Sequence, residues 1–186
     1  MKYRYLLYIV FLTLSTLTWL SCDTDNNAFK DKVEAQKNKK MFPFSETKKI
    51  EIFSYKSKDE TDNSFSLLLR DHLNNPEQLS EVLKTNKLNI KERIVLQQNQ
   101  IQDLSKLLYE NKCPDEILGN CSSARHAILF YDKNDMPIAI LEVSLDCMTV
   151  TYSKNFTKFS ICEQKINEIK KFFQEAGITY FEEPIL

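Results

Sequence analysis

The feature that most constrains this chain is an uncharged apolar run close to its N-terminus. Residues 6–20 (LLYIVFLTLSTLTWL) carry no charge, and Lys2 and Arg4 precede them. A positively charged start followed by a short apolar run is typical of an export signal. As a helix the run would span roughly 22 Å, less than the ~30 Å hydrocarbon core of a bilayer, which favours a cleaved signal over a permanent membrane span. We therefore expect these residues to take no part in the folded domain.

The run ends in Trp19-Leu20-Ser21-Cys22, which resembles the lipobox of bacterial lipoproteins, although Trp19 replaces the usual leucine. The resemblance implies that residues 1–21 are a signal peptide and that Cys22 carries lipid, with two or three acyl chains such as palmitate. The alternatives are an ordinary secretory signal cut nearby and an uncleaved anchor. As a lipoprotein, the chain is expected at the cell membrane or outer membrane, facing the periplasm or the cell exterior.

Residues 22–47 are polar, repeatedly charged and nearly free of aliphatic side chains, which predicts a flexible tether. The lysines at positions 37, 39 and 40 could touch anionic lipid, although a solvated stretch is the simpler interpretation. Residues 48–186 remain as a single globular domain, because about 140 residues suffice for one hydrophobic core and not for two.

The composition supports one folded core and limits what it can bind. Hydrophobic residues make up 42% of the chain, with 12 Phe and 8 Tyr, which is enough for a core. The formal net charge is −1, and bases and acids are interspersed, so no nucleic acid is expected as a partner. Only two glycines occur, which excludes glycine-rich phosphate loops and dinucleotide fingerprints. No cofactor is therefore expected.

Hydrophobic periodicity predicts strands mixed with helices. Strands are expected at residues 48–55, as a half-buried strand, and at 90–96, 127–132, 138–145 and 148–153. Helices are expected at 75–83, at 99–112 with a capping box of Asn99 and Gln102, and in a last helix capped by Ser160 with Glu163 and ended by Gly177. Residues 64–73 are ambiguous. This order predicts an α+β fold, a mainly antiparallel sheet with two or three helices packed on one face.

Four cysteines besides Cys22 favour two disulfides in an exported chain. If Asp132 faces Met136 across the predicted hairpin, partner numbers sum to 268 and Cys121 falls opposite Cys147. Cys113 is then left to pair with Cys162. The competing connectivity joins Cys113 to Cys121 and Cys147 to Cys162. A zinc site is the other interpretation, but the spacings fit no standard finger, so no metal is expected.

The weak candidates for chemistry are His126 and Glu142. In the same register the two face each other, an arrangement that could orient the imidazole as a general base. Ser122 and Ser123 are the nearby hydroxyls, but no Gly-x-Ser-x-Gly turn surrounds them. An ordinary cross-strand polar pair is the simpler interpretation, so no catalytic residue is assigned.

Residues 121–178 combine a cysteine, a strand ending Phe130-Tyr131-Asp132, a turn, a second strand with a cysteine, and a helix opening with Cys162-Glu163. This order resembles small uncharacterised bacterial lipoproteins of the cell envelope, and the resemblance implies the anchor and the fold but no activity. The leading hypothesis is a non-enzymatic envelope module that binds a protein partner. The alternative is a small envelope hydrolase that uses His126 and Glu142.

Overall fold

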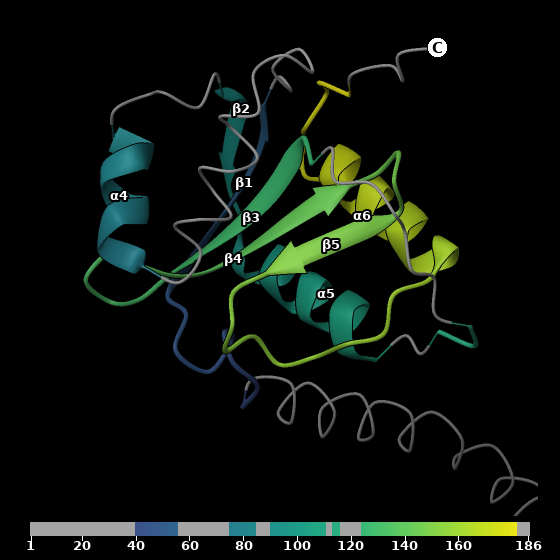
Figure 1. Ribbon diagram of the computed structural model, residues 1–186, viewed down its shortest axis with the longest axis horizontal. Coiled ribbons are helices and arrows are strands. Elements are labelled where there is room, and N and C mark those ends of the chain that lie inside the picture. Colours follow the sequence, from purple (N-terminus) through teal and green to yellow (C-terminus); the bar gives the residue numbers. More distant parts are fainter. Residues whose placement is uncertain (1–39, 56–74, 85–89, 111–112, 116–123, 182–186) are drawn as a thin grey trace, which may run out of the picture. The chain divides into compact units, whose positions relative to one another are not determined.

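The computed structural model describes residues 40–55, 75–84, 90–110, 113–115 and 124–181 (Figure 1). The predicted signal peptide, Cys22, most of the tether and residues 64–73 lie outside them. In chain order the elements are β1 (Lys49–Tyr55), α4 (Pro76–Lys84), β2 (Ile90–Val95), α5 (Gln98–Tyr109), β3 (His126–Tyr131), β4 (Pro137–Ser144), β5 (Thr149–Tyr152) and α6 (Glu163–Glu175). Among these described helices none is long and apolar enough to cross a membrane.

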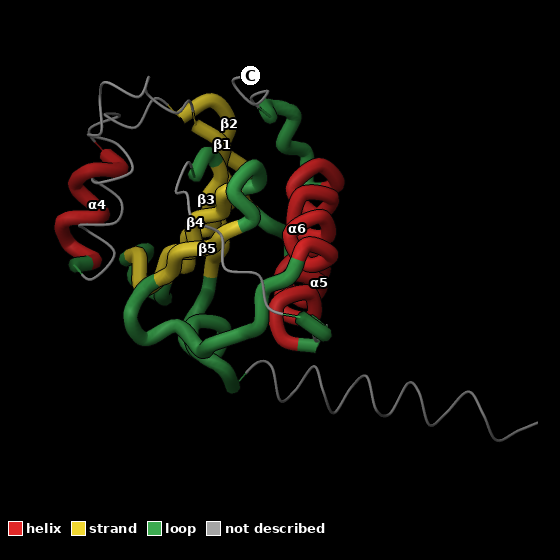
Figure 2. Tube along the Cα trace, turned by 45° about the vertical axis from the view of Figure 1, so that its right-hand side comes forward, coloured by secondary structure: helices red, strands yellow, loops and turns green. Residues whose placement is uncertain are grey.

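The five strands form one antiparallel sheet in the order β2-β1-β3-β4-β5. Helices α5 and α6 pack side by side on one face, and α4 lies on the opposite face (Figure 2). The predicted α+β fold, with two helices on one face of an antiparallel sheet, is confirmed. A third helix covers the other face in addition.

The larger hydrophobic core lies between the sheet and the α5/α6 layer. Ile52 of β1, Phe130 of β3, Leu104 of α5 and Phe173 of α6 are all fully buried there. Because side chains alternate between the faces of a strand, every second residue of β1 and β3 belongs to this core. Burial of these large side chains is the main source of stability on this face.

A smaller core fills the space between the sheet and α4. Phe53 and Tyr55 of β1 meet Leu129 of β3 and Leu79 of α4, and each of the four is at most 2% exposed. The strand at the start of the domain was predicted to be half-buried, and that prediction is wrong. Its second face carries Phe53 and Tyr55, which pack against α4, so residues 50–55 are buried on both faces of the sheet.

The starts of α4 and α5 show how local hydrogen bonds choose a helix boundary. Asn75 caps α4 as predicted, because the Gln78 amide donates to its Oδ1 over 3.3 Å. Helix α5 begins earlier than predicted, since the Gln97 amide donates to Gln100 Oε1 over 2.8 Å. Asn99, the predicted cap, therefore already lies in the first turn.

The start of α6 also differs from the prediction. Cys162 is the N-cap residue, with extended backbone, and not Ser160. The Ser160 hydroxyl instead accepts a hydrogen bond from the Cys113 amide over 3.3 Å. The predicted end is confirmed, because Gly177 has a φ of +109°, a left-handed conformation that suits glycine after a helix.

A disulfide joins Cys113 to Cys162, with Cα atoms 5.5 Å apart. It links the segment after α5 to the start of α6, as the favoured pairing predicted, and it excludes the competing connectivity. Cys147 is also disulfide-bonded. Cys121, its predicted partner, lies outside the described residues.

The β3–β4 hairpin has the predicted turn but a different register further along. The Asp132 amide donates to the Met136 carbonyl over 2.9 Å, and Tyr131 pairs with Pro137, both as predicted. An irregularity between Phe130 and Tyr131 then shifts every later pair by one residue. Numbers of paired residues beyond this point therefore sum to 269.

Residues 40–47, the end of the predicted tether, are part of the folded structure. The Phe42 carbonyl accepts hydrogen bonds from the Thr157 amide over 3.0 Å and the Tyr109 hydroxyl over 3.2 Å. Phe44 packs edge-on against Phe130, with ring centroids 5.3 Å apart. Aromatic residues thus fasten the chain to the domain before the first strand begins.

Candidate functional site

The predicted pair of His126 and Glu142 does not form. Because of the register shift, His126 lies opposite Val143, and Glu142 lies opposite Ala127. Ala127 belongs to the core under α4, whereas the His126 ring contacts Phe173 of α6. The two side chains thus leave the sheet on opposite faces. The prediction that they face each other is therefore wrong, and the described structure lacks the pairing that the alternative hydrolase was expected to use.

Glu142 instead meets Tyr55 on the α4 face. The Tyr55 hydroxyl donates to Glu142 Oε1 over 3.2 Å, and both residues are at most 2% exposed. Burial, together with the nearby carboxylate, raises the pKa of Tyr55 well above its ordinary value. The tyrosine therefore stays protonated and serves as a hydrogen-bond donor to the buried carboxylate.

His126 holds the segment that follows α6. Its Nε2 lies 3.1 Å from the Tyr180 carbonyl, to which it donates, and its ring stacks on Phe181 with centroids 4.8 Å apart. The residue is only 2% exposed, and burial lowers the pKa of the imidazole. Over the described part of the chain, Nδ1 has no hydrogen-bond partner. This histidine is therefore a neutral packing residue on the α5/α6 face.

Glu92 of β2 fastens the same segment, a role that sequence reasoning missed. Its carboxylate accepts hydrogen bonds from the Thr179 amide at 3.0 Å, the Tyr180 amide at 2.8 Å and the Ser54 hydroxyl at 3.0 Å. Burial acts to raise the pKa of Glu92, but a hydrogen bond from the Thr179 hydroxyl, together with those from the two amides and Ser54, outweighs it and holds the pKa below its usual value. In the sequence, Glu92 is only one polar residue of an alternating strand, so nothing marked it.

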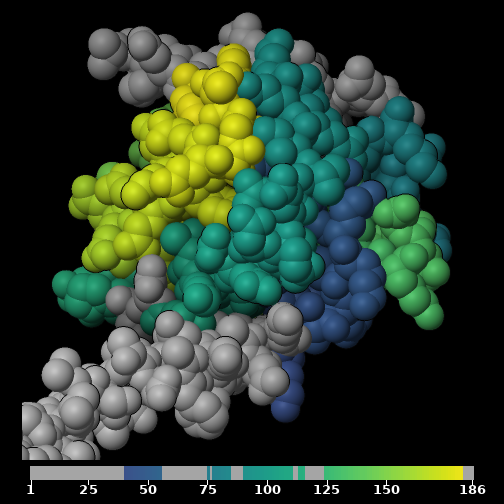
Figure 3. Space-filling model, turned by 180° about the vertical axis from the view of Figure 1, so that it is seen from behind, coloured from purple at the N-terminus to yellow at the C-terminus, as the bar shows by residue number. Residues whose placement is uncertain are grey.

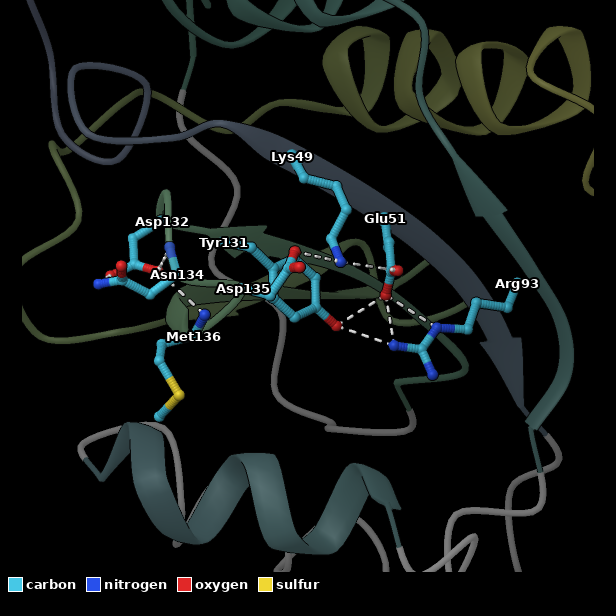
Figure 4. Close-up of polar contacts among 8 residues, drawn as sticks. All are labelled: Lys49, Glu51, Arg93, Tyr131, Asp132, Asn134, Asp135 and Met136. Carbon is cyan, nitrogen blue, oxygen red and sulfur yellow. Dashed lines mark hydrogen bonds and ion pairs between the residues drawn. The ribbon is translucent and has the colours of Figure 1, made fainter.

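A polar cluster lies where β1, β2 and β3 meet on the α4 face (Figure 4). Glu51 Oε2 accepts hydrogen bonds from the Tyr131 hydroxyl over 2.7 Å and from Arg93 Nε over 2.8 Å. Arg93 also donates to the Tyr131 oxygen over 2.9 Å. Burial and then the Glu51 carboxylate raise the pKa of Tyr131. The three groups bond one another, and the exposed Arg93 thereby supplies the partner that the buried Glu51 carboxylate and Tyr131 hydroxyl require.

Lys165 is the one lysine that the described structure buries almost completely, at 2% exposure. Its Nζ donates to the Leu108 carbonyl over 2.8 Å, in the last turn of α5. Carbonyls there lack partners within the helix, and a cation also matches the negative end of the helix dipole. Burial lowers the pKa of Lys165. The side chain thus fastens α6 to α5 and does not face a ligand.

A groove of about 430 Å³ lies between α5 and α6, the helices that lie side by side in Figure 3. Leu107 of α5 and Phe172 of α6 form its apolar floor. Its polar lining includes three carboxylates and a lysine, namely Asp103, Glu168, Glu175 and Lys171. We call it the α5/α6 groove.

Three predicted candidates, Ser122, Ser123 and Cys121, lie outside the described residues. Within the described ranges, no group of three or more His, Cys, Asp or Glu residues is placed to hold a metal ion.

No family model, no curated protein and no solved structure matches the chain. A functional proposal therefore depends on the sequence and geometry of this chain.

Proposed function

We propose that this protein is a lipoprotein of the bacterial cell envelope, held in the membrane by lipid on Cys22, whose domain binds another protein. The observation that carries the proposal is the N-terminal sequence. Two basic residues, an uncharged run at residues 6–20 and then Ser21-Cys22 stand in the order of a lipoprotein signal.

Two further features support an exported, tethered domain. The Cys113–Cys162 disulfide suits an oxidising compartment outside the cytoplasm. If the mature chain begins at Cys22, residues 22–39 precede the first described residue. A flexible stretch of this length reaches roughly 21–25 Å, so the domain works close to the lipid surface.

The α5/α6 groove is the proposed binding surface for an envelope protein. Its floor offers Phe172 and Leu107, and its rim carries more acidic than basic side chains. Apolar contact in the floor would supply binding energy, and the carboxylates would select a partner with lysine or arginine beside its apolar residues.

The anchor is tested by replacing Cys22 with serine in the full chain, expressed in a bacterial host. We expect the variant to keep its signal peptide and to carry no lipid. It should therefore not enter the detergent phase as lipidated protein does in a phase-partitioning experiment. A matched control is Ser21→Ala, which keeps a small residue before the cysteine. If Cys22→Ser is processed and fractionates as the unchanged protein does, the lipoprotein proposal is wrong.

The binding surface is tested by placing a photocrosslinking side chain at Gln100 or Glu175, on the groove, in living cells. Matched positions at Glu77 and Glu81 on the exposed side of α4 serve as controls. We expect one discrete adduct, with the same partner, from the two groove positions only. Equal adducts from the control positions, or none from the groove, would contradict this assignment.

A further inference from the structure

One end of the sheet collects exposed lysines from three separate segments, residues 40–49, 132–136 and 153–158. Lys48 precedes β1, and its amide donates to the Tyr131 carbonyl over 2.8 Å, which sets it beside the turn that carries Lys133. Both lysine side chains are exposed. Figure 1 shows all three segments at the end of the sheet where residue 40 enters the domain.

The third segment follows β5 and completes this surface. The Thr157 amide donates to the Phe42 carbonyl over 3.0 Å, so Lys158 lies close to the segment that begins with Lys40. Phe156 packs on Phe130, with ring centroids 5.5 Å apart, and thereby holds residues 153–158 against the sheet. Lys154 and Lys158 are both exposed.

The charge of these three segments, which we call the basic end, differs from that of the rest of the domain. They carry six lysines against Glu46, Asp132 and Asp135, a net charge of +3. The other described residues carry eight basic and twelve acidic side chains, a net charge of −4. A domain with one positive end has a preferred orientation at a negatively charged surface.

Two of the three acids at the basic end are already engaged. Asp135 forms an ion pair with Lys49, with Nζ and Oδ1 2.7 Å apart. Asp132 accepts hydrogen bonds from the amides of Asn134 and Met136, at 2.8 and 2.9 Å, within its own turn. The five lysines other than Lys49 are exposed to solvent.

We propose that the basic end docks on anionic phospholipid headgroups of the membrane that holds the lipid anchor. The inference rests on the proposed function, because the anchor keeps this end of the domain within reach of the headgroups. A lysine near an anionic membrane contributes on the order of 1 kcal/mol, and tethering raises the effective concentration, so a few lysines suffice. Docking sets the strands upright on the membrane and holds Tyr180 and His126 at the distal end.

The test uses the full lipidated protein reconstituted into vesicles of phosphatidylcholine, with or without phosphatidylglycerol. A membrane-impermeant lysine-acylating reagent is applied, and labelling of each lysine is measured by mass spectrometry. We expect Lys48, Lys133, Lys154 and Lys158 to react several-fold more slowly when phosphatidylglycerol is present. Lys84 and Lys91, which are exposed elsewhere, should react at the same rate. High salt should abolish the protection, because it screens the attraction.

A charge-reversed variant makes the test specific. Lys133→Glu with Lys154→Glu should remove the protection of Lys48, whereas the matched control Lys84→Glu with Lys91→Glu, of equal net charge, should preserve it. Circular dichroism checks that both variants fold. Loss of protection in the control as well would overturn the proposal, because overall charge alone would then explain the attraction.

The same samples separate the two proposals. Intact mass shows whether Cys22 carries lipid. Lipid on Cys22 with equal labelling in both kinds of vesicle would refute docking of the basic end and leave the lipoprotein proposal standing. A protein recovered without lipid would refute the lipoprotein proposal and this inference with it.

Discussion

The two faces of the sheet are both covered by helix, but their buried side chains differ in chemistry. At the centre of the α5/α6 face, Ile52, Phe130 and Phe173 are fully buried among other apolar groups. The α4 face surrounds a smaller apolar cluster with two buried carboxylates, Glu51 and Glu142, each of which accepts a hydrogen bond from a tyrosine. The α5/α6 face also buries Lys165 and His126, each bonded to a backbone carbonyl, but its stability depends mainly on buried volume and area. Stability on the α4 face depends in addition on keeping the polar partners of two carboxylates together.

The largest effect is expected from Phe173→Ala on the α5/α6 face. The ring is fully buried between α6 and the sheet, so its removal leaves a cavity. We expect a loss of about 3–5 kcal/mol in the free energy of unfolding. Urea denaturation followed by circular dichroism measures it. A smaller loss for Phe173→Ala than for Glu51→Gln on the α4 face would contradict the contrast between the two faces.

Removing the Cys113–Cys162 disulfide should destabilise the same face by a different route. The bond closes a separation of 49 residues and thereby restricts the unfolded chain. The double substitution Cys113→Ser with Cys162→Ser should lower the free energy of unfolding by about 2–4 kcal/mol. Thermal unfolding with and without the substitutions reports it. An unchanged melting temperature would show that the bond adds nothing to the α5/α6 layer.

On the α4 face, Glu51→Gln keeps the shape of the side chain but removes the charge that Arg93 and Tyr131 share. Since Arg93 is partly exposed to solvent, we expect a loss of about 1–3 kcal/mol. Glu81→Gln, on the exposed side of α4, is the matched control and should change stability by less than about 0.5 kcal/mol. Equal stability of the two variants in urea would contradict a supporting role for the cluster.

The smallest effect is a pH dependence that arises on the α5/α6 face. Burial lowers the pKa of His126 in the folded protein below its ordinary value of 6.5. Below that pH the unfolded chain takes up a proton that the folded chain does not bind, so stability should fall as the pH falls. His126→Gln should reduce this slope, measured as the urea unfolding free energy at several pH values. A slope that steepens in the variant would contradict the burial of a neutral imidazole.

Much of the fold could be predicted from the sequence because it depends on local patterns. Alternating apolar residues located β1, and Asn75 followed by Pro76 located the start of α4. Gly177 located the end of α6 through its backbone conformation. The pairing of Cys113 with Cys162 was also predicted correctly, although the hairpin register used to choose it is shifted by one residue in the structure. The first three features act within a few residues of the chain.

The surroundings of His126 and Glu142 could not be predicted, because they depend on a single irregularity in the sheet. The shift between Phe130 and Tyr131 lies beside Pro137, but a proline also fits the first residue of a regular strand, so it did not reveal the shift that separates His126 from Glu142. The contacts of Glu92 with Thr179 and Tyr180 join residues far apart in the chain. Tertiary contacts of this kind leave no periodic signal in a sequence.

The central claim is that the chain is cleaved before Cys22 and lipidated there, and the intact mass of protein extracted from membranes tests it most directly. The account predicts a mass that equals residues 22–186 plus a diacylglyceryl group, with or without a further acyl chain. A mass equal to the unmodified full chain, or to an unmodified chain cut at another residue, would contradict it.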